Sequence, residues 1–61
     1  MFKEFIEIYP IDKKVIAKRN ININNIVEVR EVNKDMNEIY LSDGRSFHTT
    51  TKDFVIVQYN G

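Results

Sequence analysis

Apolar and polar residues alternate with a period of two along most of this 61-residue chain. Runs rich in Ile, Val, Phe, Tyr and Thr are separated by short turn signals at Pro10, Asn24-Asn25, residues 33–36 and Ser42-Asp43-Gly44. Such alternation between turn signals indicates strands rather than helices. We therefore expect one small all-β domain over residues 1–61, built as an antiparallel meander or an SH3-like barrel of five to six short strands.

The first turn signal predicts a hairpin with a four-residue loop, Pro10 to Lys13. Pro10 suits the first corner of a type I turn. Because the index sum of facing residues is constant in an antiparallel pair, this loop places Ile8 opposite Val15, Ile6 opposite Ala17 and Glu4 opposite Arg19. The other face of the hairpin is then a half-apolar candidate contact surface, made of Phe5, Glu7, Tyr9, Ile16 and Lys18.

The second hairpin turns at Ser42-Asp43-Gly44. A two-residue Asp-Gly turn is the strongest short hairpin signal, but here it would scatter the apolar residues over both faces. A three-residue loop with Gly44 in the left-handed region brings the apolar residues of both strands, Ile39, Leu41 and Phe47, onto one face. Tyr40, Ser46 and His48 then share the opposite, wetter face.

Two further segments complete the expected sheet. In the strand of residues 26–32, Val27 and Val29 should point inward. The segment 54–59 combines three consecutive β-branched residues, which favour a strand, with an upstream Thr51 that could cap a short helix. We expect the strand, and because both of its faces are apolar it needs a partner. It supplies the predicted interface of a homo-oligomer: Phe54, Val55, Ile56, Val57 and Tyr59.

The length of the chain also favours self-association. A domain of this size has a small core and usually needs an additional source of stability. Disulfides and thiolate metal sites are excluded because the chain has no cysteine, and His48 is its single histidine. We therefore expect no metal site and no cofactor, and a homo-oligomer.

Charge and motifs narrow the function classes. Nine basic residues balance nine acidic ones, so the net charge gives no reason to expect a strong sequence-independent grip on nucleic acid. No basic leader and no membrane-spanning apolar run is present, which predicts a cytoplasmic protein without membrane contact. Recognised catalytic patterns are also missing, so we expect no enzymatic activity.

The densest group of polar residues runs from Arg45 to Lys52. Its guanidinium, hydroxyl, imidazole and ammonium groups would suit a small anion. The candidate ligand-binding residues are Arg45, His48, Thr50, Thr51 and Lys52, with Tyr40 beside them. The plainer interpretation carries more weight: threonine is a favoured strand residue, and the charges are ordinary surface charges.

A pattern-level resemblance covers about half of the chain. Ile23 to Val29, followed by Ile39 to Thr49, resembles the strand-turn-strand pattern of small FlbD-like flagellar proteins and of half a LytTR domain. Similarity to FlbD-like proteins implies a compact β fold, whereas similarity to LytTR domains implies DNA binding. No binding residue can be transferred from either family.

Together these observations predict a non-enzymatic, self-associating binding module. The richness in Ile, Asn and Lys is typical of AT-rich genomes and fits a phage-type accessory or inhibitor protein. Its expected partner is a host protein or a small anionic ligand such as a nucleotide. The alternative is a small nucleic-acid-binding regulator, which the exposed tyrosines and four basic residues suggest: Arg19, Arg30, Arg45 and Lys52.

Overall fold

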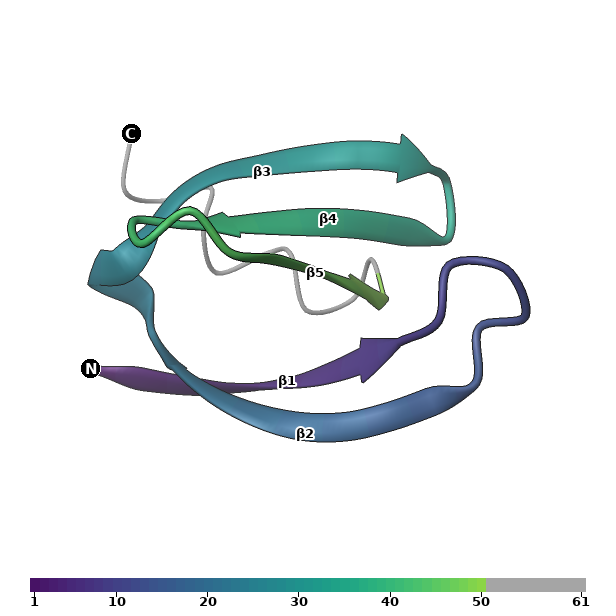
Figure 1. The fold of residues 1–61 in the computed structure, drawn as a ribbon, viewed down its shortest axis with the longest axis horizontal. Coiled ribbons are helices and arrows are strands. Elements are labelled where there is room, and N and C mark those ends of the chain that lie inside the picture. The colour runs from purple at the N-terminus through teal and green to yellow at the C-terminus, as the bar shows by residue number, and fades with distance from the viewer. Residues whose placement is uncertain (51–61) are drawn as a thin grey trace.

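Five antiparallel strands and one turn of 3-10 helix make up residues 1–50, the part of the chain that the computed structural model describes. The elements are β1 (Phe2–Ile8), β2 (Val15–Asn22), η1 (Ile23–Asn25), β3 (Ile26–Asn33), β4 (Met36–Leu41) and β5 (Ser46–Thr50). They form one open sheet in the order β2-β1-β5-β4-β3 (Figure 1). The expected all-β class is confirmed, with five strands. The segment 54–59, predicted to be a strand, lies outside the described residues.

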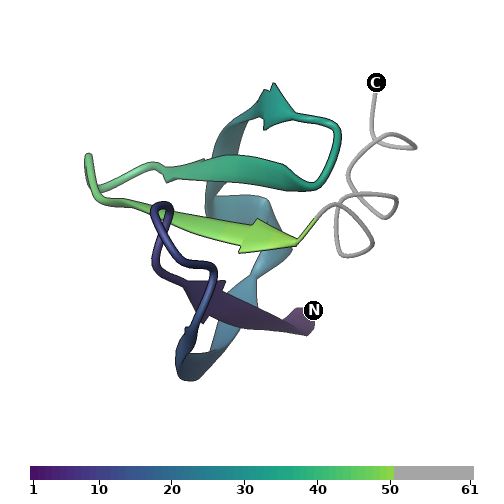
Figure 2. The same ribbon diagram turned by 90° about the vertical axis from the view of Figure 1, so that its right-hand side faces the viewer.

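The sheet consists of two halves that are joined by a short ladder. The β1–β2 hairpin is one half and the β3–β4–β5 meander is the other. Within residues 1–50, two residue pairs connect them, Glu7 with Thr49 and Ile8 with His48. Viewed along its long axis, the sheet is strongly bent, with β3 and β4 at one end and β1 and β2 at the other (Figure 2). The η1 turn carries the chain from one edge of the sheet to the other.

The core fills the inner face of the bent sheet. Its buried residues are Phe5, Ile21, Ile39, Leu41 and Phe47, with Ile26 and Val29 packed against them. Phe5 and Phe47 meet edge to face, with 5.9 Å between their ring centroids. Burial of each such side chain contributes about 1.5–3 kcal/mol, and an aromatic pair adds about 0.5–1.5 kcal/mol. This contact therefore holds the hairpin against the meander.

The β4–β5 hairpin has the predicted geometry. Ile39 pairs with Phe47 and Tyr40 with Ser46, which is the register of a three-residue loop. The Leu41 N–H donates to the Arg45 carbonyl at 2.8 Å. Gly44 has φ of +92°, so its predicted positive φ is also confirmed.

The β1–β2 hairpin agrees with the prediction at its loop and departs from it along its strands. The Tyr9 N–H donates to the Lys14 carbonyl at 2.9 Å, which closes the four-residue loop, and Ile8 pairs with Val15. Beyond that pair a bulge shifts the register by one residue, because Ile16 is an extra residue on β2. Phe5 therefore pairs with Arg19 and lies in the core, not on the outer contact surface that was expected.

A bulge in β3 explains the position of Val27, which was expected to point inward. The β3–β4 register shifts between Ile26 and Glu28, so Val27 is an extra residue on β3. It is 64% exposed, whereas Val29, opposite Ile39, packs on the core as predicted. A second shift makes Val32 another extra residue. Bulges of this kind cannot be read from alternation alone, because they change its phase.

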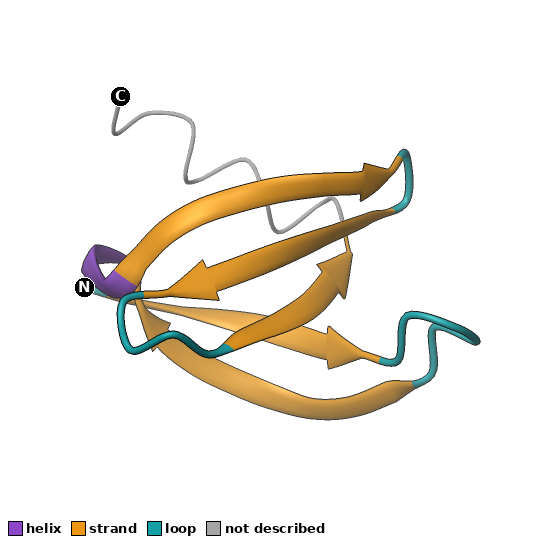
Figure 3. Cartoon of the chain, turned by 45° about the horizontal axis from the view of Figure 1, so that its top comes forward, coloured by secondary structure: helices purple, strands orange, loops and turns teal. Residues whose placement is uncertain are grey.

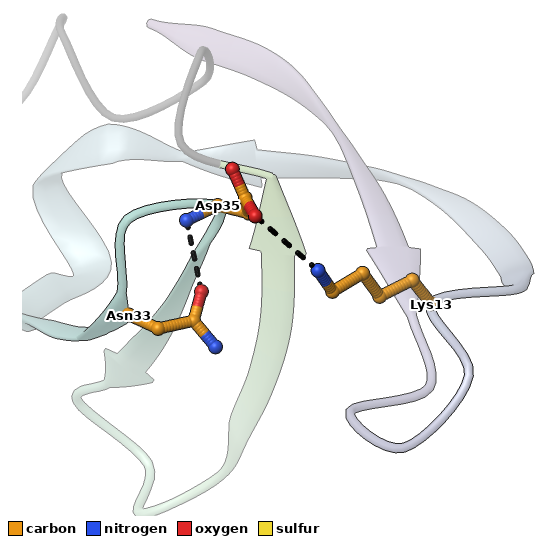
Figure 4. Close-up of polar contacts among 3 residues, drawn as sticks. All are labelled: Lys13, Asn33 and Asp35. Atoms are coloured by element: carbon orange, nitrogen blue, oxygen red, sulfur yellow. Dashed lines mark hydrogen bonds and ion pairs between the residues drawn. The ribbon is translucent and has the colours of Figure 1, made fainter.

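An ion pair links the tips of the two halves at the end of the sheet opposite η1. Lys13 Nζ, in the β1–β2 loop, lies 3.4 Å from Asp35 Oδ2, in the β3–β4 turn (Figure 4). The Asp35 N–H donates to Asn33 Oδ1 at 2.8 Å, which fixes that turn. Because both charged side chains are about half exposed, the pair contributes little to stability and mainly restricts the positions of the two tips.

The conformation of Gly44 gives the first testable prediction. A Cβ at this position would meet no atom within 4 Å, so a substitution is penalised through φ and not through a clash. Gly44→Val should lower the free energy of unfolding by about 1–3 kcal/mol in urea denaturation. Gly44→Asn is the control, because asparagine tolerates positive φ, and it should lose clearly less. Equal stability of the valine variant and the wild type would contradict the assigned loop.

Candidate functional site

The outer face of the meander brings three of the predicted site residues together. Tyr40 on β4 and His48 and Thr50 on β5 lie on the side of the sheet opposite the core. Glu38 pairs with His48 and Ser46 pairs with Tyr40, so Glu38 and Ser46 also belong to this face. The sequence therefore predicted this grouping correctly as far as Tyr40, Ser46 and His48 are concerned.

Glu38 is the centre of a hydrogen-bond network on this outer face. Tyr40 donates its hydroxyl to Glu38 Oε1 at 2.9 Å, and Ser46 donates its own to Oε2 at 3.2 Å. The guanidinium of Arg30 on β3 lies 5.1 Å from the centroid of the Tyr40 ring. The hydrogen bond to Glu38 and partial desolvation raise the pKa of Tyr40 above its usual range. Glu38 thus already provides an acceptor for both hydroxyls, and it places a carboxylate beside the candidate residues.

Arg45 lies apart from this network, in the β4–β5 loop. Its Nε donates to Asp43 Oδ2 at 2.7 Å, and its backbone N–H donates to Asp43 Oδ1 at 3.0 Å. The backbone hydrogen bond is the main reason why the pKa of Asp43 is lowered, and the guanidinium adds to it. Arg45 is therefore held in a loop of balanced charge.

The remaining predicted residues fall on the part of the chain that is not described. Thr51 and Lys52 of the candidate ligand site lie outside residues 1–50. The same holds for the candidate interface residues Phe54, Val55, Ile56, Val57 and Tyr59.

The N-terminus, η1 and the β4–β5 loop lie at the same end of the sheet (Figure 3). Residues of these segments and of β2 line a hollow of about 280 Å³. The buried side chains of Ile21 and Leu41 contribute apolar surface to it. The other lining residues are Phe2, Asn20, Asn22, Asn25, Ser42, Asp43 and Arg45. Among residues 1–50, Arg45 is the one residue that this hollow shares with the predicted ligand site.

The asparagines of the hollow are the residues that sequence reasoning missed. The run Asn20 to Asn25 reads as the end of a strand followed by a turn, and this is confirmed: the Asn22 side chain caps η1 by accepting from the Asn24 N–H at 3.0 Å. This capping role explains why an asparagine occupies position 22, but it does not explain the asparagines at positions 20 and 25. The high density of asparagine was the available signal. Its meaning depends on the β4–β5 loop, which lies about twenty residues further along the chain.

A second polar group lies on the inner face, beside the core. Arg19 Cζ lies 5.1 Å from the centroid of the Phe47 ring, and Arg19 Nη1 lies 3.3 Å from Glu7 Oε1.

Asn37 is a buried polar residue on the same side of β4 as Ile39, and it is only 1% exposed. Its Oδ1 and Nδ2 atoms have no hydrogen-bond partner among the described residues. An amide that is buried in this way destabilises the fold, and nothing in the alternation of residues indicated it.

Other classes of site are not evident in residues 1–50. Within them, no three His, Cys, Asp or Glu side chains are grouped so that they could hold a metal ion. No helix in this part of the chain has the length and apolarity that are needed to cross a membrane. A comparison with known protein families, curated proteins and solved structures found no match to the chain. The likeness to FlbD-like proteins and LytTR domains therefore stays one of strand and turn pattern.

The orphaned amide of Asn37 leads to a stability prediction. Asn37→Leu should raise the free energy of unfolding by about 1–3 kcal/mol, because it removes a buried polar group that has lost its hydrogen bonds to water. Asn33→Leu, in the same hairpin, should have the opposite effect, since Asn33 Oδ1 accepts from the Asp35 N–H. Urea denaturation of both variants measures the difference. A loss of stability in Asn37→Leu would show that the amide has a partner in solution.

The Glu38 network gives a prediction about pH. Glu38→Ala should lower the pKa of Tyr40, because the main interaction that favours its protonated form is removed. Glu28→Ala should lower it less, since Glu28 is the weakest of the contributing groups. The ring resonances of Tyr40 in an NMR pH titration report the change. In the wild type the raised pKa stabilises the fold below pH 10, the ordinary pKa of tyrosine, and this contribution is lost as the pH rises through the folded pKa.

Proposed function

We propose that this protein is a non-enzymatic binding module that forms a homodimer through the β3 strands of two copies. The observation that carries the proposal is the open sheet: β3 is an eight-residue edge strand, and its outer edge has no partner strand among the described residues. A strand edge of this kind presents unpaired backbone N–H and C=O groups to another chain. Strand addition at an edge is a common mode of association.

The sequence of β3 is self-complementary when two copies run antiparallel with Val29 on the two-fold axis. Glu28 of each copy then faces Arg30 of the other. In a single copy, Arg30 Nη2 already lies 3.5 Å from Glu28 Oε2. The two-fold axis therefore creates a network of four alternating charges. A shift by one residue in one direction places Glu28 opposite Glu31, and a shift in the other direction places it opposite Val29, so both lose the charge pairs.

The two faces of β3 support the same register. Glu28 and Arg30 pair with Tyr40 and Glu38, so they lie on the outer face of the sheet. Val29 pairs with Ile39 and lies on the core side, where a second Val29 would extend the apolar layer. The bulges at Val27 and Val32 restrict a regular ladder to the residues between them. The expected interface is thus short and centred on Val29.

The other edge strand is not suited to the same contact. The middle of β2 carries Lys18 and Arg19, and a symmetric antiparallel pairing of two β2 strands centred on either residue brings like charges together. The β2 edge therefore opposes an isologous dimer, whereas the β3 edge favours one. A closed two-fold dimer also leaves the hollow and the β4–β5 loop outside the interface, so that each copy can bind its own ligand.

Light scattering on the full chain tests the dimer. The wild type should be a dimer at micromolar concentrations, and Arg30→Glu should be a monomer because Glu28 of each copy would then face a second carboxylate across the axis. The double variant Glu28→Arg with Arg30→Glu should restore the dimer, since the alternation of charge returns. Circular dichroism checks that each variant keeps its fold.

Lys18→Glu is the matched control, since it changes an exposed charge on the opposite edge. It should leave the dimer unchanged. If Lys18→Glu dissociates the wild-type assembly, the contact runs from β2 to β3, and the two-fold arrangement is wrong. A wild-type protein that stays monomeric up to about 100 μM would contradict self-association altogether, because contacts of this kind are expected at micromolar concentration.

A further inference from the structure

We infer that the hollow between β2, η1 and the β4–β5 loop is a binding site for a nucleobase, presented by a nucleoside or a nucleotide. The inference rests on the proposed binding role but does not depend on the β3 dimer. The volume of about 280 Å³ lies at the lower limit of ligand pockets, which span about 300–1,000 Å³. The site therefore fits one small ring system rather than an extended ligand.

The asparagines give the hollow a capacity to recognise the edge of a base. A carboxamide offers an acceptor and two donors in one plane, which matches the donor and acceptor pairs on a base edge. Asn20 and Asn25 are both exposed and line the hollow from β2 and η1. Asn22 lies between them and is fixed by its hydrogen bond from the Asn24 N–H. The turn between β2 and η1 is thus fixed by a side-chain hydrogen bond, which lowers the entropy that is lost on binding.

Phe2 supplies an aromatic surface at the same place. It pairs with Asn22 across the β1–β2 ladder, so ring and carboxamide share one face of the sheet. Its side chain is 68% exposed and takes no part in the core. Stacking of a base on an exposed aromatic ring is the main source of affinity in many single-stranded nucleic-acid sites. Phe2 is therefore available to bind a ligand, and its ring is not part of the core that residues 1–50 form.

The charges select the base rather than the phosphate. Among the described residues, Arg45 and Asp43 are the charged ones that line the hollow, and Arg45 Nε donates to Asp43 Oδ2 at 2.7 Å. A phosphate approaching the guanidinium would also meet the Asp43 carboxylate, whose lowered pKa keeps it ionised. A neutral polar ring meets no such repulsion. The hollow is therefore expected to bind a nucleoside and its 5′-monophosphate about equally tightly.

Chemical-shift mapping by NMR on the full chain tests the inference. Adenosine, guanosine, cytidine and uridine are each titrated to about 5 mM, a concentration that would largely saturate a site with a Kd of about 1 mM. At least one nucleoside should shift the amide signals of Asn20, Asn25 and the β4–β5 loop. Its 5′-monophosphate should shift the same signals with a similar Kd, and ribose 5-phosphate, which lacks the base, should shift none of them.

Two pairs of variants make the test specific. Phe2→Ala should weaken nucleoside binding about fivefold or more, whereas Tyr9→Ala, which removes another exposed aromatic ring outside the hollow, should leave it unchanged. Asn20→Ala should weaken binding, and Asn24→Ala, whose exposed side chain does not line the hollow, should not.

Three outcomes would overturn the inference. The first is the absence of any shift at the hollow with all four nucleosides. The second is an equal response to ribose 5-phosphate, which would make the site a simple anion site. The third is equal binding by the Phe2→Ala and Tyr9→Ala variants. Light scattering tests the dimer independently of these titrations. A negative NMR result would therefore not contradict the dimer, and a monomeric protein could still bind the base.

Discussion

The contact between Phe5 and Phe47 is the interaction on which the rest of the structure depends. Among the described residues, the two halves of the sheet share two residue pairs in their β1–β5 ladder, so backbone hydrogen bonds between these pairs connect them weakly. The edge-to-face packing of these rings, with Arg19 stacked over Phe47, joins the hairpin to the meander through side chains. The hollow is a product of this arrangement, because its walls come from both halves.

Much of the fold could be predicted because its local rules are unambiguous in this sequence. In the β4–β5 hairpin, Gly44 and the alternation of Ile39, Leu41 and Phe47 agree on one loop length, and the structure has that loop. The β1–β2 hairpin was predicted correctly only up to the Ile8–Val15 pair. The bulge at Ile16 reverses the faces beyond it, and Phe5 enters the core as a result. The position of a bulge depends on how the two halves pack together, and the alternation of residues within one strand gives no information about that packing.

The candidate site shows the same division between local and long-range information. Tyr40, Ser46 and His48 share a face because they lie on two adjacent strands of one hairpin, so their grouping follows from the register. Glu38, which accepts from two of these side chains, belongs to that register but was not weighed as a member of the site. The hollow needs β1, β2, η1 and the β4–β5 loop at once. Its assembly depends on the bend of the sheet, and that bend cannot be predicted from the spacing of residues along the chain.

The β1–β5 ladder has a consequence for the order in which the chain folds. Three of the four strand pairings join strands that follow each other in sequence, whereas Glu7 and Thr49 come from opposite ends of the described chain. Closing that long loop costs more entropy than closing a hairpin, and the two residue pairs described between β1 and β5 offset little of this cost before the core packs. The hairpin and the meander are therefore expected to form early and separately, with their docking as the rate-limiting step. Substitutions at Phe5 would then slow folding, whereas changes at the two loop tips would mainly alter the rate of unfolding.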